Sequence, residues 1–319
     1  MTKEDLRIVF MGTPEFAVET LRALVENGYN VVAVVTQPDK PVGRHGSVLQ
    51  PSAVKQYAVA QGLPVLQPEK MKNPEFVEAL RSYRANLQVV VAFRMLPEVV
   101  WAMPEYGTFN VHAALLPQYR GAAPINWAVI NGERQTGVTT FFLDHDIDTG
   151  RIIKKMPFDI PDEADVEYVY NGLMRLGANL CLATLELIVA ANGHPETVAQ
   201  DDAELKHAPK IFKETCEIDW TKTARQVYDF VRGLSPVPGA WTTLVAPDGK
   251  ETVLKIYKTR KMGKAGQGSG RISMEGKALC ISATDELLEI VELQLAGKKR
   301  MTARDFLNGM KQIEGYRVK

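Results

Sequence analysis

Two polar side chains near the middle of the sequence are spaced for joint chemistry. Asn110 and His112 stand two residues apart in the apolar run FNVHAALLP, residues 109–117. Side chains at positions i and i+2 of a β-strand point to the same face. We therefore expect a carboxamide and an imidazole to project side by side where a strand gives way to a loop. An amide N–H can donate to a developing oxyanion, and an imidazole can donate or move a proton.

A third candidate lies in the stretch LDHDIDTGRI, residues 143–152. Its alternating aspartates resemble the start of a calcium loop, but Thr149 and Lys155 occupy the positions that need glycine and a bidentate glutamate. No metal site is expected. Asp144 and Asp146 are compatible with a solvated turn. Asp148 comes where the turn ends tightly, so its carboxylate could orient an imidazole or accept a proton from an attacking amine.

An amide, an imidazole and a carboxylate without a neighbouring nucleophilic serine or cysteine indicate direct acyl transfer, with no covalent enzyme intermediate. The spacing alone leaves the structural alternative open. An asparagine at a strand end often caps a turn, and a lone histidine is often a satisfied polar residue. Asn110, His112 and Asp148 are therefore candidates at this point of the argument.

The elements that must position these residues alternate between strand and helix. Apolar runs predict strands at residues 7–12, 31–37, 87–93, 107–112 and 137–143, with helical patterns between them and a long helix over 165–191. Continuously apolar strands are typical of a parallel sheet covered by helices on both faces. We expect an α/β domain with a doubly wound, Rossmann-like sheet.

The first strand-to-helix turn, MGTPEFA, argues against a dinucleotide site. It contains a single glycine, Gly12, whereas close approach of a pyrophosphate needs glycine at several positions. Thr13 is expected to cap the helix that Pro14 begins. A dehydrogenase function is therefore poorly supported by this turn.

The pattern changes in the C-terminal third. Residues 192–209 are polar and lack an apolar period, so they are interpreted as a linker. Five short strand patterns follow at close spacing, which suggests a small OB-like β-barrel. The predicted domains are 1–191 for catalysis, 192–209 for the linker and 210–319 for the barrel. A long polar loop is expected over 38–50.

Charge is distributed unevenly between these parts. The net charge of the whole chain is zero, but residues 1–208 hold 18 Lys+Arg against 25 Asp+Glu and residues 209–319 hold 20 against 13. A basic C-terminal third favours an anionic partner, although a merely solvated basic surface remains open from charge alone. Three dispersed cysteines, no signal peptide and no long apolar run predict a cytoplasmic protein without a membrane span.

The string NVHAALLPQYRG followed by DHDIDTG resembles the signature of the folate-dependent formyltransferases. The stretches FMGTPEFA, TQPDKPVGR, LQPSAVK, GAAPINWAVI, SPVPGAW and DFLNG resemble the branch that formylates methionine on charged initiator tRNA. The resemblance covers nearly the whole chain. It implies 10-formyltetrahydrofolate as co-substrate, charged initiator tRNA as partner, no metal and a role in translation initiation. A monomer is expected.

This resemblance also assigns roles to residues. It makes Asn110, His112 and Asp148 the catalytic triplet, and it places tRNA contacts at Arg44 and His45 in the 38–50 loop. The expected folate contacts are Phe93, Arg94, Met95, Leu96, Ala114, Leu115, Leu116 and Pro117. Two departures stand out: Ala114 replaces the usual serine, and the loop sequence GRHGSVLQ lacks the paired lysines often found after Gly-Arg.

Two alternatives share part of this pattern. A sugar-nucleotide N-formyltransferase would have the triplet but is expected to lack the basic barrel. A non-catalytic tRNA-binding protein would not need an intact triplet.

Overall fold

The computed structural model describes residues 1–43, 46–202, 205–310, 312–313 and 315–319. The chain forms two compact units, neither of which is continuous in sequence. Unit 1 consists of Met1–Gly121, Gln135–Asp159 and Tyr170–His207. Unit 2 consists of Ala122–Arg134, Ile160–Val169 and Ala208–Lys319.

A seven-stranded sheet in the order β10-β9-β7-β6-β1-β2-β5 organises unit 1. The five strands from β7 to β5 run parallel, and β9 and β10 add an antiparallel edge. The sheet strands are β1 Arg7–Gly12, β2 Asn30–Val35, β5 Val65–Leu66, β6 Leu87–Val91, β7 Thr108–His112, β9 Gln135–Phe142 and β10 Ile152–Asp159. The runs that predicted strands at 7–12, 87–93 and 107–112 thus form the centre of the sheet.

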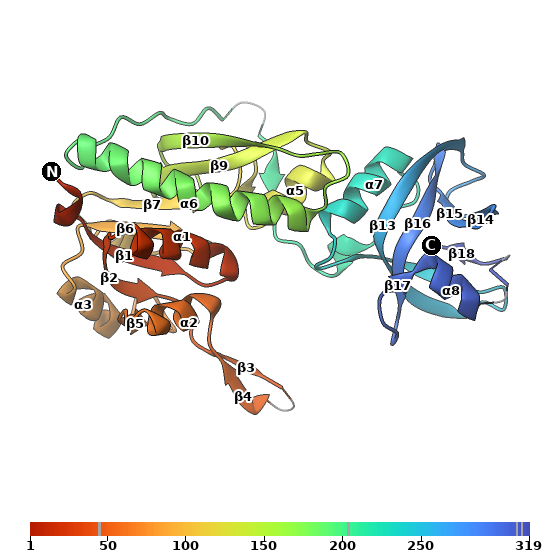
Figure 1. Cartoon of the computed structure of the whole chain (residues 1–319), viewed down its shortest axis with the longest axis horizontal. Coiled ribbons are helices and arrows are strands. Elements are labelled where there is room, and N and C mark those ends of the chain that lie inside the picture. The colour runs from red at the N-terminus through yellow and green to blue at the C-terminus, as the bar shows by residue number, and fades with distance from the viewer. Residues whose placement is uncertain (44–45, 203–204, 311, 314) are drawn as a thin grey trace. The chain divides into compact units, whose positions relative to one another are not determined.

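Helices cover both faces of this sheet because its central strands are apolar on both sides (Figure 1). The helices of unit 1 are α1 Glu15–Glu26, α2 Ala53–Ala60, α3 Pro74–Ser82, α4 Glu98–Trp101 and most of α6 Val166–Ala190. Val9 and Met11 pack with α3 and α4 in one core. On α6, a Cβ added at Gly172 would lie 2.2 Å from the Phe158 ring, so this helix lies directly on β10. The predicted doubly wound α/β fold is confirmed.

The structure shows which local residues start the helices, and it contradicts one predicted helix cap. The side chain of Asn73 accepts from the Glu75 N–H at 3.0 Å, with Pro74 in the first turn. The interpretation of Thr13 as a cap was wrong: α1 begins at Glu15, with Pro14 at the N-cap, and no side chain of the described residues caps it.

Helix α6 is long and apolar enough to span a membrane, but 44% of that stretch is buried inside the protein, as in a core helix.

Two parts of the predicted loop over 38–50 form strands. Strands β3 Lys40–Val42 and β4 Val48–Gln50 pair in an antiparallel hairpin. The side chains of Val48 and Leu49 are largely exposed. The described residues of both strands are exposed or half-buried, so they give no alternating apolar pattern, and the sequence predicted only a loop.

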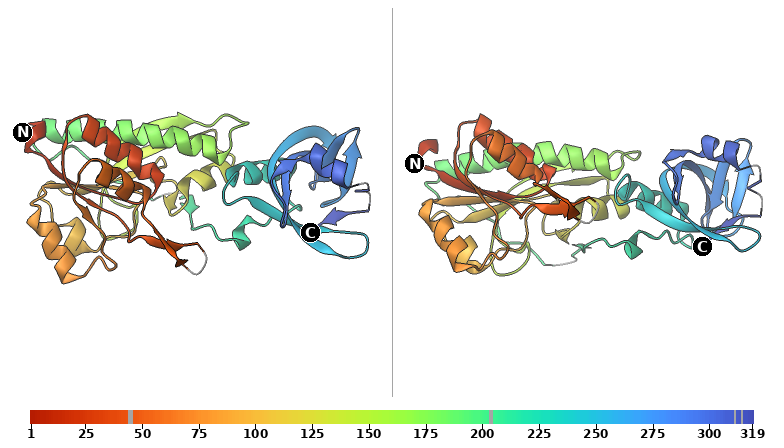
Figure 2. Two further views of the ribbon diagram at one scale, coloured as in Figure 1. Left: turned by 60° about the horizontal axis from the view of Figure 1, so that its bottom comes forward. Right: turned by 90° about the horizontal axis from the view of Figure 1, so that it is seen from below.

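Unit 2 contains a small, strongly curved sheet (Figure 2). Its strand order is β14-β15-β16-β13-β12-β18, and β17 pairs with β16. Its strands are β12 Ala240–Val245, β13 Glu251–Ala265, β14 Ile272–Glu275, β15 Ala278–Ser282, β16 Glu286–Leu295, β17 Met301–Thr302 and β18 Arg317–Val318. The Val318 N–H donates to the Gly270 carbonyl at 2.9 Å, which links β18 back to the start of β14. The predicted C-terminal β-domain is confirmed.

The helices of unit 2 are α5 Pro124–Ile130, α7 Ala224–Gly233 and α8 Ala303–Gly309. A capping box between Thr223 and Gln226 starts α7, whose apolar face joins the core of the barrel. Short strands β8 Arg120–Gly121 and β11 His207–Ala208 lie outside the two large sheets. Unit 2 therefore includes α5 and the residues 160–169, and the linear domain boundaries at 191 and 209 stay predictions.

Candidate active site

The carboxyl ends of three parallel strands meet at one edge of the unit 1 sheet. The strand register pairs Gly12 with Val91, and Val91 with Val111. Thr13, the segment after Val91 and His112 therefore follow one another along this edge. In open α/β sheets such an edge is where ligands bind.

Several polar atoms at this edge are buried and have no hydrogen-bond partner within the described part of the chain. They are Thr13 Oγ1, Arg94 Nε and Asn110 Oδ1. Buried polar groups are rarely left unpaired in native proteins. Their position at the ends of β1, β6 and β7 indicates a site that takes its missing hydrogen bonds from a ligand.

His112 is almost fully buried, with 6% of its surface exposed, and its ring orientation is fixed. Its Nε2 lies 3.0 Å from the Tyr119 carbonyl oxygen. Because a carbonyl only accepts, Nε2 carries the proton, and in the neutral ring Nδ1 carries the lone pair. Nδ1 lies 3.8 Å from Asp148 Oδ2. The structure thus brings the two residues together across 36 positions of sequence.

Asp148 is held at this place by the backbone. The Gly121 N–H donates to Asp148 Oδ2 at 3.0 Å. The φ angle of Asp148 is +57°, in the left-handed region. Ala92 and Tyr119, also next to the site, have φ angles of +47° and +61°. Left-handed conformations cost free energy in residues other than glycine, and they cluster at functional sites, where the surroundings enforce them.

The candidate folate residues after β6 differ in exposure. Met95 is 70% exposed, whereas Leu96 is buried in the core. The guanidinium of Arg94 donates to the carbonyls of Pro68 and Glu69, and burial lowers its pKa. Arg94 therefore fastens the end of β6 to the chain at 68–69, and Met95 is the member of this group that is open to a ligand.

Side chains of β9 and β10 form hydrogen bonds with the backbone of the turn after His112. Thr139 Oγ1 donates to the Ala114 carbonyl at 2.7 Å and accepts from the Leu116 N–H at 3.1 Å. The ammonium of Lys155 donates to the Leu116 carbonyl, and burial lowers the pKa of this lysine. Ala114 and Leu116 are fully buried, while Leu115 and Pro117 are half-buried. The turn is fixed in place by the two strands.

Sequence reasoning missed the residues that hold these loops. Thr139, Lys155 and Gln200 donate to or accept from the backbone of the segments that carry the candidate residues. Gln200 lies in the stretch interpreted as a linker, and no motif distinguished it. The two predicted tRNA contacts, Arg44 and His45, lie outside the residues that the structure describes.

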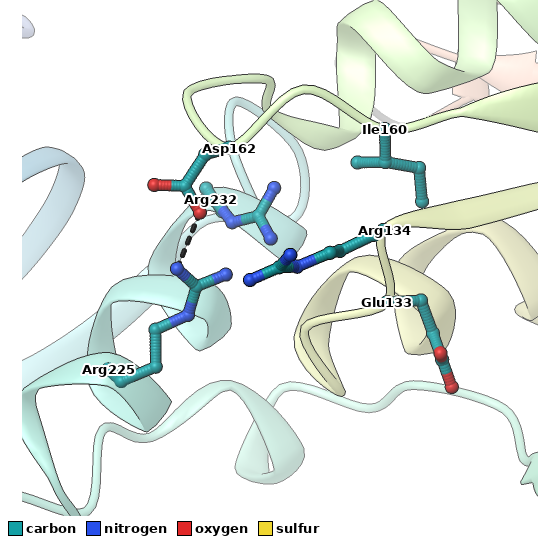
Figure 3. Close-up of a pocket in the computed structure, with 6 residues that line it drawn as sticks. All are labelled: Glu133, Arg134, Ile160, Asp162, Arg225 and Arg232. Carbon is teal, nitrogen blue, oxygen red and sulfur yellow. Dashed lines mark hydrogen bonds and ion pairs between the residues drawn. The ribbon is translucent and has the colours of Figure 1, made fainter.

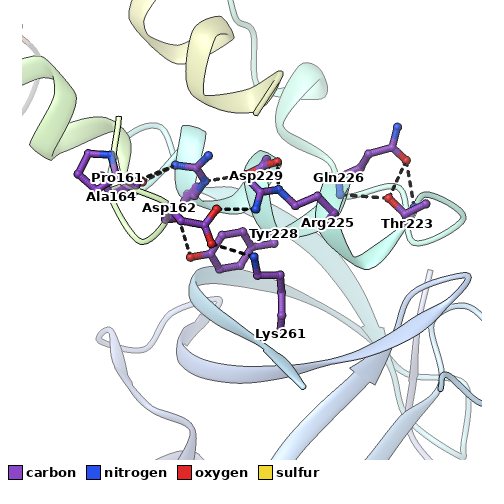
Figure 4. A network of polar contacts seen from close by, with 10 residues as sticks. Pro161, Asp162, Ala164, Thr223, Arg225, Gln226, Tyr228, Asp229 and Lys261 are labelled. Atoms are coloured by element: carbon purple, nitrogen blue, oxygen red, sulfur yellow. Dashed lines mark hydrogen bonds and ion pairs between the residues drawn. The ribbon is translucent and has the colours of Figure 1, made fainter. Parts of the chain in front are cut away.

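A second group of charged side chains surrounds α7 in unit 2. A cavity of about 340 Å³ is lined by Glu133, Arg134, Ile160, Asp162, Arg225 and Arg232 (Figure 3). The buried Asp229 accepts from Arg225 Nε and Arg232 Nε at 2.7 Å each. Asp162 pairs with Arg225 and with Lys261 (Figure 4).

The hydrogen bond from Lys261, together with that from Arg225, lowers the pKa of Asp162 to about 2. The acids thereby neutralise much of the basic charge around the cavity. These contacts fasten residues 160–165 to α7 and β13, which is a structural role.

Models of two families match the chain. "Formyl transferase" matches residues 6–185, and "Formyl transferase, C-terminal domain" matches residues 210–311. Methionyl-tRNA formyltransferases from Parabacteroides distasonis and Bacteroides thetaiotaomicron are 60% and 55% identical to the chain, and each alignment covers all of both proteins. The chain belongs to the methionyl-tRNA formyltransferase family. It is an enzyme of formyl transfer.

Several solved structures share the fold of this chain despite low sequence identity. HypX from Aquifex aeolicus, in complex with tetrahydrofolic acid, aligns with a TM-score of 0.63 at 20% identity, over 95% of this chain and 47% of HypX. The sugar 3N-formyl transferase WlaRD aligns with a TM-score of 0.63 at 18% identity, over 92% of this chain and 99% of WlaRD. Formyltransferases with different acceptors thus share this fold, and the acceptor must be inferred from other evidence.

Proposed function

We propose that this formyltransferase transfers the formyl group of 10-formyltetrahydrofolate to the amino group of methionyl initiator tRNA, with Asn110, His112 and Asp148 as its catalytic residues. The observation that carries the assignment is their geometry. A buried, unpaired amide oxygen, an imidazole in a fixed tautomer and a carboxylate 3.8 Å from that imidazole lie at the carboxyl edge of the sheet. The full-length relatives support methionyl tRNA as the acceptor.

Each member of the triplet has a distinct task. Attack of the amine on the formyl carbon forms a carbon–nitrogen bond and places negative charge on the formyl oxygen. The Asn110 amide N–H donates to that oxyanion, and its unpaired Oδ1 is free to accept from the incoming amine. His112 Nδ1 takes the proton that the amine loses, because Nε2 is occupied by the Tyr119 carbonyl.

Asp148 stabilises the imidazolium that results, since its Oδ2 faces Nδ1 and is itself fixed by the Gly121 N–H. Returning the proton to the departing nitrogen of the folate completes the transfer as the old carbon–nitrogen bond breaks. The proposed steps do not require a metal.

The folate is proposed to lie against the predicted contacts after β6 and β7. The exposed Met95 and the half-buried Leu115 and Pro117 offer apolar surface for a flat ring, and the unpaired Thr13 hydroxyl and Arg94 Nε offer polar partners. Phe93 packs beneath the Arg94 guanidinium at 5.7 Å, while Leu96, Ala114 and Leu116 support the same surface from the core.

The tRNA is proposed to contact the basic C-terminal third and the 38–50 segment, including Arg44 and His45. Phosphate contacts position a nucleic acid without reading its bases. A planar guanidinium such as that of Arg44 can bind phosphate in two places or stack on a base. As an enzyme of translation, the protein is proposed to act in the cytoplasm as a monomer.

The test is a competition assay. Labelled 10-formyltetrahydrofolate is supplied with charged initiator tRNA, charged elongator tRNA and a nucleotide-linked hexosamine, and the formylated product is identified. We expect label on initiator tRNA, and a fall in kcat of about 10²–10³-fold in Asn110→Ala with little change in folate affinity. Label on the hexosamine would make the chain a sugar-nucleotide formyltransferase, and no label on any acceptor would make it a non-catalytic binding protein.

A further inference from the structure

Gln200 uses both ends of its carboxamide to connect two loops of the candidate active site. Its Nε2 donates to the carbonyls of Asp148 at 2.9 Å and Gly150 at 2.8 Å. Its Oε1 accepts from Arg120 Nε at 3.1 Å and Nη2 at 2.8 Å. Because carbonyls only accept and a guanidinium only donates, these partners permit a single orientation of the amide.

Arg120 belongs to the short segment that supports both His112 and Asp148. The Tyr119 carbonyl accepts from His112 Nε2, and the Gly121 N–H donates to Asp148 Oδ2. The chain of contacts therefore closes on itself. It runs from the Asp148 backbone through Gln200 and Arg120 to the neighbouring Gly121, and from there back to the Asp148 carboxylate.

Lys206 also contacts the segment 118–121. The Lys206 carbonyl accepts from the Tyr119 N–H at 2.6 Å, and the Lys206 N–H donates to the Gln118 side chain at 2.8 Å. Lys206, like Gln200, is thus fastened to the segment 118–121, which carries the Tyr119 carbonyl and the Gly121 N–H.

The contacts of Gln200 hold the Asp148 backbone in an unfavourable conformation. Asp148 has a left-handed backbone, and without enforcement the loop over 143–150 would relax toward commoner angles. The side chains of Arg120 and Asp148 are 11% and 13% exposed, so water does little to replace a lost contact there. Rotation of the Asp148 backbone would carry its carboxylate away from His112 Nδ1.

We propose that Gln200 and Arg120 are positioning residues for formyl transfer, which hold the Asp148 carboxylate against His112. The proposal rests on the catalytic roles proposed above. It predicts that loss of the Gln200 donor lowers the rate of the chemical step, since misplacement of a reacting group by about 1 Å can cost on the order of 10²-fold. Binding of either substrate is not expected to change.

The test variant is Gln200→Glu, which has the same size and keeps an acceptor for Arg120 but places an oxygen against the two carbonyls. We expect kcat to fall by about 10–100-fold, with KM for charged tRNA and for the folate within about twofold of wild type. The matched control is Asp202→Asn, which removes the negative charge of the exposed residue that Arg120 contacts at 2.7 Å and should leave kcat unchanged. Gln200→Met, which lacks donor and acceptor, is the second variant should Gln200→Glu not fold.

A double-variant cycle separates positioning from general stability. If Gln200 acts through Asp148, then adding Gln200→Glu to Asp148→Asn should lower kcat by less than about twofold more, whereas independent effects would multiply. A folded Gln200 variant with wild-type kcat, or multiplicative losses in the cycle, would overturn the proposal. An inactive wild-type enzyme would contradict the proposed function itself, and this inference with it.

Discussion

Gly150 offers a direct test of how closely Asp148 must be placed. Gly150 is buried, and an added Cβ would lie 1.7 Å from the carbonyl oxygen of Phe142 and 3.2 Å from the Phe141 ring. Contacts of a Cβ below 3.0 Å essentially do not occur, so Gly150→Ala must shift this part of the chain by about 1.3 Å. Phe142 is fixed in β9, and the loop that carries Asp148 is therefore the part that moves.

The displacement is large on the scale of catalysis. Asp148 lies two residues from Gly150, and its carboxylate is 3.8 Å from His112 Nδ1. A shift of this size would also break the contact between the Gly150 carbonyl and Gln200. We expect kcat to fall by about 10²-fold. Overpacking of this kind costs about 1–3 kcal/mol of folding free energy, so the variant should still fold.

The assay is single-turnover formylation of charged initiator tRNA, with thermal melting measured on the same samples. Gly309→Ala is the matched control, because no atom of the described residues lies within 4 Å of its added Cβ. The control should keep wild-type kcat. A folded Gly150→Ala enzyme with a rate near that of wild type would show that the position of Asp148 does not limit the reaction, and the reasoning would be refuted.

Three further results are expected. Thr139→Val removes two buried hydrogen bonds at a cost of about 1–3 kcal/mol each and should raise KM for the folate, whereas Thr139→Ser keeps the hydroxyl and should match wild type in a steady-state assay. Asp162 has a pKa lowered from 3.8 to about 2 in the folded protein, so its stabilising effect is complete above pH 4 and is lost as the pH falls through 2. Because this side chain is 54% exposed, Asp162→Asn should lower the free energy of unfolding at pH 6 by less than about 1 kcal/mol, and by a smaller amount at pH 2, where much of the carboxyl is protonated; an equal loss at both values in urea titrations would contradict the assignment. Affinity for charged tRNA should fall steeply between about 50 and 200 mM salt, as filter binding would show, and a flat response would exclude phosphate contacts by the basic third.

Short-range patterns in the sequence were sufficient for the core of the fold. Apolar runs of five or six residues indicated β1, β6 and β7, because strands buried on both faces exclude polar side chains. Asn73 followed by Pro74 is a local sequence pattern typical of a helix start, and α3 begins there, with the Glu75 N–H donating to the Asn73 side chain. The spacing of Asn110 and His112 placed both on one face for the same reason: side-chain direction in a strand repeats every two residues.

Contacts between residues far apart in the sequence could not be predicted from an apolar period. No residue of strands β3 and β4 is buried, and residues 160–169 belong to unit 2, where Asp162 pairs with Lys261, 99 positions away. Gln200 bonds to residues 50 and 52 positions distant, and its neighbours in sequence resemble those of any polar linker.

The sequence by itself determined which residues can form buried strands and helices, and it determined that Asn110 and His112 share one face of a strand, because both depend on periodicity within a few residues. Only the tertiary structure decided that Asp148 faces His112, that Thr139 and Lys155 support the turn, and that Gln200 closes the ring of contacts behind them. A buried polar side chain forms hydrogen bonds with whichever residues the fold brings next to it. The identity of those residues produces no periodic pattern in the neighbouring sequence.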